Sequence, residues 1–214
     1  MRKTIFSVAI LFSSIILFLL TYEFRAEQEQ KFSGYSLSDE EYALIQDGDI
    51  VLRHGYGLVS DIIVETLKEK YAISHCAVIS VKDGNYKVIH TISQSISECN
   101  GVQDQPMVPF VYQSHYNSLI VVRFKGVPDA GKRISDRALD YLDQKIPFDH
   151  NFDLIDSTEF YCSELIWRII LKEFDVDIFP EKDPQVRQYL NFSNFYNSDF
   201  FDIIINHHQR KKIK

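Results

Sequence analysis

Cysteine and positive charge are both scarce in this chain of 214 residues. Its three cysteines are too few for a disulfide scaffold, which needs a denser and even-numbered set. Cys76 and Cys99 remain able to pair in an oxidising compartment, which would leave Cys162 free. The absence of any Cys-x-x-Cys pair argues against a structural zinc site. The formal net charge of −7 argues against nucleic acid as a partner, because nucleic acids bind basic surfaces.

The first 26 residues form a segment distinct from the rest of the chain. Arg2 and Lys3 precede an apolar run from Ile5 to Leu20, which is the pattern of an export signal. A signal cleaved after Ala26 would have a small residue two positions earlier, where this chain has Phe24. We therefore expect residues 1–26 to be a signal peptide or, in better agreement with Phe24, a signal anchor. Either way, the domain that follows is expected in the periplasm or at the cell surface.

Beyond this segment the chain has the length of one globular domain. Residues 27–46 are expected to form a polar stalk and a leading helix that starts near Ser38, and residues 47–214 the domain itself. Hydrophobic periodicity predicts strands at 50–52 and 119–124, a helix capped by Ser60 at 61–70, and a helix at 132–145. Residues 179–214 show no clear period and receive no assignment.

A single cysteine lies where a polar loop turns into an apolar helix. Leu165, Ile166 and Ile169 recur at helical spacing, so segment 163–172 is expected to bury one face. Cys162 then lies at the first turn, where unpaired N–H groups and the helix dipole favour the thiolate, the nucleophilic form. The alternative for this residue on its own is a buried, inert thiol.

Two histidines are brought together by the parity of a predicted hairpin. Two β-branched segments flank Asp83-Gly84, a strong signal for a two-residue turn. With these residues as the loop, Ala77 lies opposite His90, and His75 shares the face of Ala77 because strand side chains alternate. His75 and His90 are then diagonal neighbours on one face. We expect the helix start that bears Cys162 to lie over this face, which is the layout of an activated thiol.

The remaining histidines are expected to have surface or polar-packing roles. A single histidine is more often satisfied by hydrogen bonds than used in catalysis, and only the register of the hairpin favours a functional reading for His75 and His90. The other five are His54, His115, His150, His207 and His208.

Four short motifs carry a resemblance to a known family: Gly48-Asp49-Ile50, Ser74-His75, Pro147-Phe148-Asp149 and Tyr161-Cys162-Ser163-Glu164-Leu165. Over about residues 47 to 178 the chain resembles the YiiX/YebB-like exported cysteine hydrolases of the NlpC-related superfamily. The resemblance implies an α+β fold of the circularly permuted papain-like type, with a small antiparallel sheet packed on the nucleophile-bearing helix. The order of histidine before cysteine is the permuted order.

By the same resemblance, Cys162 is the nucleophile, His75 the base and His90 the third polar residue. Tyr161 and Asp149, which belong to the matching motifs, are expected to contact the substrate. The YiiX-like members carry an acidic residue at the third position, whereas a histidine there is closer to the related lecithin:retinol acyltransferase branch. This chemistry needs no metal and no organic cofactor.

The expected function is therefore that of an exported cysteine hydrolase that cleaves amide bonds, such as those of cell-wall peptides. Its partners would be an amide- or ester-containing envelope substrate and, through the N-terminal segment, the membrane. Two alternatives remain open. One is a lipid-directed acyl hydrolase or acyltransferase, which His90 and the membrane-proximal segment favour. The other is a catalytically silent binding module on the cell envelope.

Overall fold

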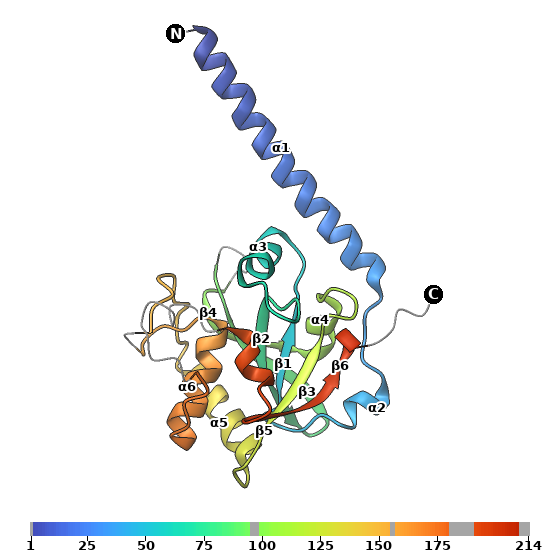
Figure 1. Ribbon diagram of the computed structural model, residues 1–214, viewed down its shortest axis with the longest axis vertical. Helices are drawn as coiled ribbons and strands as arrows, with labels where there is room; N and C mark the ends of the chain where they lie inside the picture. The colour runs from blue at the N-terminus through green and yellow to red at the C-terminus, as the bar shows by residue number, and fades with distance from the viewer. Residues whose placement is uncertain (1, 95–98, 155–156, 180–190, 210–214) are drawn as a thin grey trace.

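A computed structural model of the protein describes residues 2–94, 99–154, 157–179 and 191–209, and shows a long N-terminal helix joined to a domain built on one antiparallel sheet (Figure 1). The sheet has six strands in the order β4-β3-β2-β1-β5-β6. Their bounds are β1 Ile50–Arg53, β2 His75–Lys82, β3 Asn85–Ile92, β4 Gly101–Pro106, β5 Ile120–Phe124 and β6 Phe201–Asn206.

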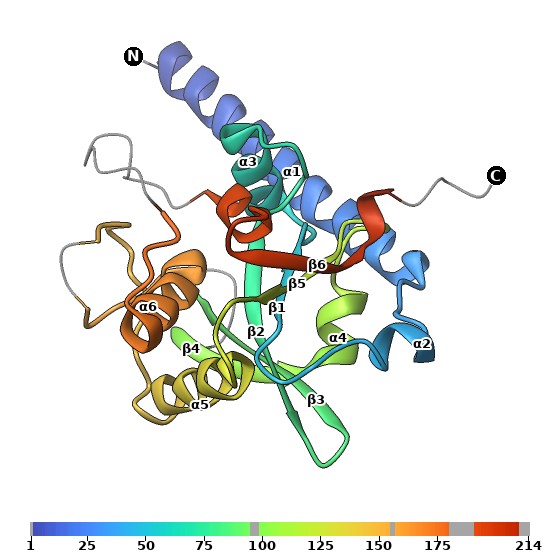
Figure 2. The same ribbon diagram turned by 60° about the horizontal axis from the view of Figure 1, so that its bottom comes forward.

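Helices cover both faces of this sheet (Figure 2). They are α2 Asp39–Tyr42, α3 Leu58–Leu67, α4 Met107–Tyr112, α5 Ala130–Asp143 and α6 Cys162–Phe174, with short 3-10 turns η1 Phe192–Tyr196 and η2 His207–Gln209. One face packs against α5, α6 and η1. The other packs against α2 and α4.

The alternation of strand side chains divides the core into these two halves. In β2, Cys76 and Val78 join the core on the α6 side. Ala77 and Ile79 join the core on the α4 side, around Phe110. Because nearly every side chain of the central strands is buried, the middle of the sheet has no solvent-exposed face.

The predicted hairpin is confirmed. Lys82 pairs with Asn85, so Asp83-Gly84 is the two-residue loop between β2 and β3. Both loop residues have positive φ, 52° for Asp83 and 75° for Gly84. Such a loop requires positive φ at both positions, and Gly and Asp are among the residues that tolerate it. The register of the two strands is therefore the predicted one.

The predicted start of the second helix is wrong. Hydrophobic spacing placed that helix after Ser60, whereas α3 begins at Leu58 with Gly57 as its N-cap. Ser60 does not cap it. The N–H of Leu58 instead donates to a carboxylate oxygen of Glu23, from the N-terminal helix, at 3.0 Å. Because Glu23 and Leu58 are 35 residues apart in the sequence, this contact leaves no pattern near Leu58 that predicts the start of the helix.

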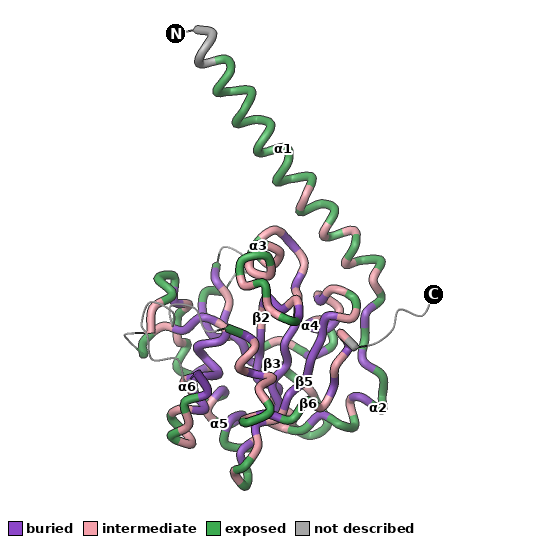
Figure 3. The backbone as a smooth tube through the Cα atoms, viewed as in Figure 1, coloured by how far each residue is buried: buried purple, intermediate pink, exposed green. Residues whose placement is uncertain are grey.

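The N-terminal helix α1, Arg2–Ser33, extends away from the domain (Figure 3). Within its stretch Phe6–Ser33, a window of 18 residues has a mean hydropathy of 2.0 and is 0% buried, so the helix is long and apolar enough to cross a membrane. The helix does not break at residue 26 but continues through the first part of the predicted stalk. Near its C-terminal end it contacts the domain, since the Tyr22 hydroxyl donates to the carboxylate of Asp61.

Candidate active site

The hairpin places two imidazoles in direct contact. His75 is the first residue of β2, and His90 lies near the end of β3, opposite Ala77 by extension of the observed register. Nε2 of His75 and Nδ1 of His90 are 2.8 Å apart, a hydrogen bond. The rings meet edge to face at a centroid distance of 5.0 Å, and Phe110 contacts both. The prediction that the two histidines share a face is confirmed.

Both imidazoles are held in the neutral form. Burial, then the neighbouring His90, then the charge of Arg53 keep the pKa of His75 well below its usual value. Burial and Arg53 lower the pKa of His90 to about 3, against a smaller opposing effect of Asp104. A neutral His75 is able to accept a proton at pH 7.

Cys162 is the first residue of α6, after Tyr161 at the N-cap position, whose side chain does not cap the helix. The pKa of the Cys162 thiol is lowered, chiefly by a hydrogen bond with the thiol of Cys76. Burial acts in the opposite direction, and the N–H groups of Ser163, Cys76 and Cys162 itself lower the pKa further. The N–H groups of Cys162 and Ser163 are those left unpaired at the start of α6, and the N–H of Cys76 comes from strand β2, so the expected activating environment is present.

The predicted position of the Cys162 helix over the histidine face is wrong. Helix α6 packs on the face that carries Cys76. His75 and His90 lie on the opposite face, where the ring of Phe110 contacts both. Consecutive strand residues point to opposite faces, so His75 and Cys76 are separated by the sheet. Hairpin parity determines which histidines share a face, but it contains no information on which face a distant helix covers.

The cysteine and the histidines nevertheless line one cavity. Because His75 stands at the end of its strand, its side chain reaches the same cavity of about 560 Å³ that Cys162, His90 and Tyr161 line. Among the residues that the structure describes, no hydrogen bond joins Cys162 to His75. The predicted sulfur–imidazole bond is thus not present in this structure.

Of the two residues expected to contact substrate, only Tyr161 lines the cavity. Its ring packs against Phe152, with centroids 5.5 Å apart. Asp149 is buried and is not among the cavity-lining residues. One of its carboxylate oxygens accepts hydrogen bonds from the N–H groups of Asn151, at 2.7 Å, and Phe152, at 3.0 Å. Asp149 therefore stabilises a turn beside the cavity through Oδ1, while its Oδ2 is buried without a hydrogen-bond partner among the described residues.

A residue that the sequence analysis did not single out, Arg53, also lines the cavity. It ends β1 directly opposite His75 and is buried. The loss of hydration lowers the pKa of its guanidinium to about 9. The only local signal is an arginine at the end of a short apolar strand, which on its own is common.

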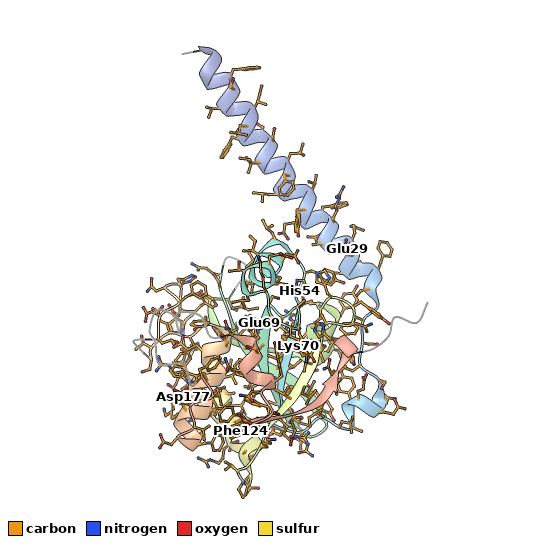
Figure 4. All side chains as sticks on the ribbon, viewed as in Figure 1. Glu29, His54, Glu69, Lys70, Phe124 and Asp177 are labelled. Carbon is orange, nitrogen blue, oxygen red and sulfur yellow. The ribbon has the colours of Figure 1, made fainter. Side chains whose placement is uncertain are left out.

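A second cluster joins two histidines expected to have minor roles. Nε2 of His54 lies 2.8 Å from Oδ1 of Asp61, and Nε2 of His115 lies 4.0 Å from the same oxygen. A backbone hydrogen bond of 2.8 Å from His115 N–H to the His54 carbonyl holds the two segments together. Figure 4 shows His54 close to the part of α1 that carries Glu29.

Of the other histidines, His150 also lines the cavity, and His207 lies in the core. His207 is buried, with Nε2 2.7 Å from a carboxylate oxygen of Glu41 and Nδ1 hydrogen-bonded to the Tyr35 hydroxyl, which is the expected polar-packing role. None of the three cysteines forms a disulfide. Cys76 is buried and Cys99 exposed, so the alternative pairing of these two is not present.

Comparisons with known proteins identify a fold. No protein-family model matches the chain, and no curated protein matches it. Among solved structures, the chain is similar to the crystal structure of the metalloprotein yiiX from Escherichia coli O157:H7. The sequence identity is 16%, the TM-score is 0.58, and the match covers 75% of this chain and 97% of yiiX. At this identity the likeness supports the fold, a mixed α/β domain with one antiparallel sheet.

Proposed function

We propose that the protein is an exported cysteine hydrolase that cleaves amide bonds. Cys162 is the nucleophile, His75 the base, and His90 the residue that orients the base. The observation that carries this proposal is the hydrogen-bonded His75–His90 pair in the cavity that Cys162 also lines. The lowered pKa of the Cys162 thiol at a helix start supports it, because a thiolate is the attacking species.

The bond between the histidines defines which nitrogen carries each proton. For His75 to accept the thiol proton on Nδ1, its Nε2 must carry a hydrogen, which it donates to Nδ1 of His90 over 2.8 Å. His90 then has its own hydrogen on Nε2, a buried atom without a hydrogen-bond partner among the described residues. A neutral histidine fixes the tautomer of the base but stabilises an imidazolium less than a carboxylate does.

The reaction forms and breaks one thioester. His75 takes the proton of Cys162 as the sulfur attacks the substrate carbonyl, and N–H groups at the start of α6 stabilise the oxyanion. His75 passes this proton to the leaving amine, which departs as the carbon–nitrogen bond breaks. Water then attacks the thioester with His75 as base, which releases the acid and restores the thiol. Because Cys162 and His75 are not hydrogen-bonded here, substrate binding must bring them together.

The circularly permuted papain-like, NlpC-related fold is part of this proposal. The order of His75 before Cys162, the antiparallel sheet and the likeness to yiiX support it. The location is also part of this proposal: α1 anchors the domain outside the cytoplasm, where cell-wall peptides offer amide bonds. A lipid-directed acyl hydrolase and a silent binding module are the alternatives that the test below must separate.

The test is the trapping of an acyl adduct. The full-length protein in detergent is incubated with a mixed cell-envelope extract and analysed by mass spectrometry. We expect a peptidyl adduct on Cys162, and complete loss of adduct and turnover in Cys162→Ala with an unchanged fold. The matched control is Cys99→Ala, which removes an exposed thiol and should retain turnover.

Three other outcomes have distinct meanings. A fatty-acyl adduct would favour the lipid-directed alternative. Labelling of Cys162 by a thiol probe no faster than a free thiol, with no adduct, would indicate the silent module. Turnover that persists in Cys162→Ala beyond a trace would remove Cys162 from the mechanism altogether.

A second candidate function is the binding of a divalent metal ion, and one cluster favours it. Ligand atoms of His54, Asp61 and His115 lie within 4.8 Å of one another. Nε2 of His115 is buried without a hydrogen-bond partner in the described part of the chain. Two imidazoles and a carboxylate suit Zn²⁺ and leave one position open. The similar structure of yiiX is that of a metalloprotein. An ion held here would link the end of β1, helix α3 and the segment after α4.

Metal binding is measured by equilibrium dialysis of the full-length protein against Zn²⁺ after treatment with a chelator. We expect one Zn²⁺ per chain, a raised Tm in its presence, and loss of both effects in Asp61→Asn and His115→Gln. His75→Gln is the matched control, because it removes an imidazole outside the cluster. Binding lost in His75→Gln but kept in His115→Gln would place the metal in the catalytic cavity and contradict this candidate.

A further inference from the structure

Arg53 is a buried cation in the wall of the cavity. Arg53 is only 7% exposed, and it lies directly opposite His75 where β1 pairs with β2. Phe110 holds the guanidinium at two points. Nη1 of Arg53 donates to the carbonyl oxygen of Phe110 at 2.7 Å, and Cζ lies 4.0 Å from the centroid of the Phe110 ring. The cation is therefore fixed in place rather than free to swing into solvent.

This cation has no anionic partner in the described part of the chain. Its Nε is buried there without a hydrogen-bond partner, and no described Asp or Glu forms an ion pair with it. The carboxylate of Asp104, whose charge acts on His90, pairs instead with Lys87 at 2.8 Å. The two imidazoles beside Arg53 are neutral and add no negative charge.

An unpaired buried charge is costly, and burial alone explains the lowered pKa of this guanidinium. Such a cost is sustained where a ligand supplies the missing charge. The planar fork of arginine donates two parallel hydrogen bonds to a carboxylate, which makes it the best side chain for that group. The cavity that Arg53 lines is the one that holds Cys162 and both histidines.

We propose that Arg53 binds a carboxylate of the substrate close to the amide bond that Cys162 attacks, so that the protein selects peptides with a free C-terminal or acidic side-chain carboxylate. The part played by Cys162 rests on the proposed function, whereas the carboxylate site does not depend on it.

The position of the cavity relative to α1 favours a peptide over a lipid. Gln30 of α1 lines the cavity, ten residues beyond Leu20, where the apolar run Ile5–Leu20 ends. A helix rises about 1.5 Å per residue, so the cavity lies about 15 Å past that point along the helix. The ester carbonyls of a phospholipid stay near the boundary of the hydrocarbon region. A peptide that projects from the membrane surface, by contrast, reaches the cavity while it stays in water.

The first experiment measures alkylation of Cys162 in the full-length protein, followed by mass spectrometry of the peptide that contains it. Two pairs of reagents are compared: iodoacetate with iodoacetamide, and N-iodoacetylglycine with N-iodoacetylglycinamide. Within each pair, one reagent carries a carboxylate and the other carries a neutral amide in its place. The two pairs place the carboxylate at two different distances from the sulfur. For each pair, the ratio of rates is divided by the same ratio for a small free thiol.

For at least one pair we expect this ratio to favour the carboxylate by about tenfold, which corresponds to one strong charged contact. Arg53→Gln should abolish the preference, and Arg53→Lys should restore part of it, because lysine keeps the charge but loses the fork. The matched control is Lys87→Gln, which removes an equal charge outside the cavity and should leave the ratio unchanged. No preference in either pair, or one that survives in Arg53→Gln, would overturn the proposal.

The second experiment does not need a reactive cysteine. Thermal unfolding of full-length Cys162→Ser is followed with added N-acetylglycine, N-acetylglycinamide or inorganic phosphate. The carboxylate probe should raise Tm, the neutral amide should not, and Arg53→Gln in the same background should remove the effect. Stabilisation by phosphate alone would replace the proposed carboxylate with a phosphate ligand. A carboxylate effect without any turnover would retain the site and reject the hydrolase.

Discussion

The buried imidazole of His90 contributes to the acid sensitivity of this domain. His90 is 1% exposed, and its pKa is lowered to about 3 by burial and by the charge of Arg53. In the unfolded chain its pKa returns to about 6.5. Between about pH 3 and pH 6.5 the unfolded state therefore binds one more proton than the folded state. The contribution of neutral His90 to the free energy of unfolding is complete above about pH 6.5 and is lost as the pH falls.

We expect the free energy of unfolding to fall by about 1.4 kcal/mol per pH unit for this histidine below pH 6. Glu164, whose pKa burial raises to about 8, acts in the opposite direction above pH 4.5, so slopes must be compared between variants. Urea unfolding from pH 4.5 to 7 provides them. His90→Gln should flatten the slope, and exposed His150→Gln should not. Equal slopes in both variants would contradict the assignment of neutral His90.

At the scale of elements, local signals predicted the parts of the site that depend on neighbours in sequence. The Asp83-Gly84 turn determines the register, and the register brings His75 and His90 together. The apolar spacing after Cys162 determines where α6 begins. Each of these is a short-range property, which is why the prediction and the structure agree.

The features that sequence analysis missed all depend on contacts between distant segments. The face covered by α6 follows from packing against the whole sheet. Arg53 becomes significant only because it lies in the cavity without a carboxylate partner among the described residues. His54 becomes significant only because Asp61 and His115 come near it. β6 lacks a clear pattern because, at the edge of the sheet, only some of its side chains are buried.

For the molecule as a whole, α1 is part of the domain's structure as well as a helix long and apolar enough to cross a membrane. The carboxylate of Glu23 accepts the N–H of Leu58 at the start of α3, whose own N-cap residue, Gly57, has no side chain to do so. The carbonyl of Lys31 accepts a hydrogen bond from the Tyr112 hydroxyl at 3.3 Å. Helix α1 thus supplies a cap that the sequence of α3 lacks.

Removing that cap should loosen α3 and little else. In the full-length chain, Glu23→Ala is expected to cost α3 about 0.5–1 kcal/mol and to speed amide exchange in its first turn by about two- to fivefold. Hydrogen exchange followed by mass spectrometry measures this. Glu27→Ala changes an exposed residue on the same helix and serves as the control. The same protection of α3 in both variants would show that the contact contributes nothing.

The pairing of β6 with β5 ties late residues of the chain to early ones. His207, just after β6, holds Tyr35 and Glu41, which precede it by 172 and 166 residues. In a chain exported from its N-terminus, as proposed, Tyr35 and Glu41 cross the membrane before their partner His207 does. This edge of the sheet stays incomplete until residue 207 has crossed. The domain then completes its fold after translocation, so the export channel receives a chain whose sheet is still incomplete.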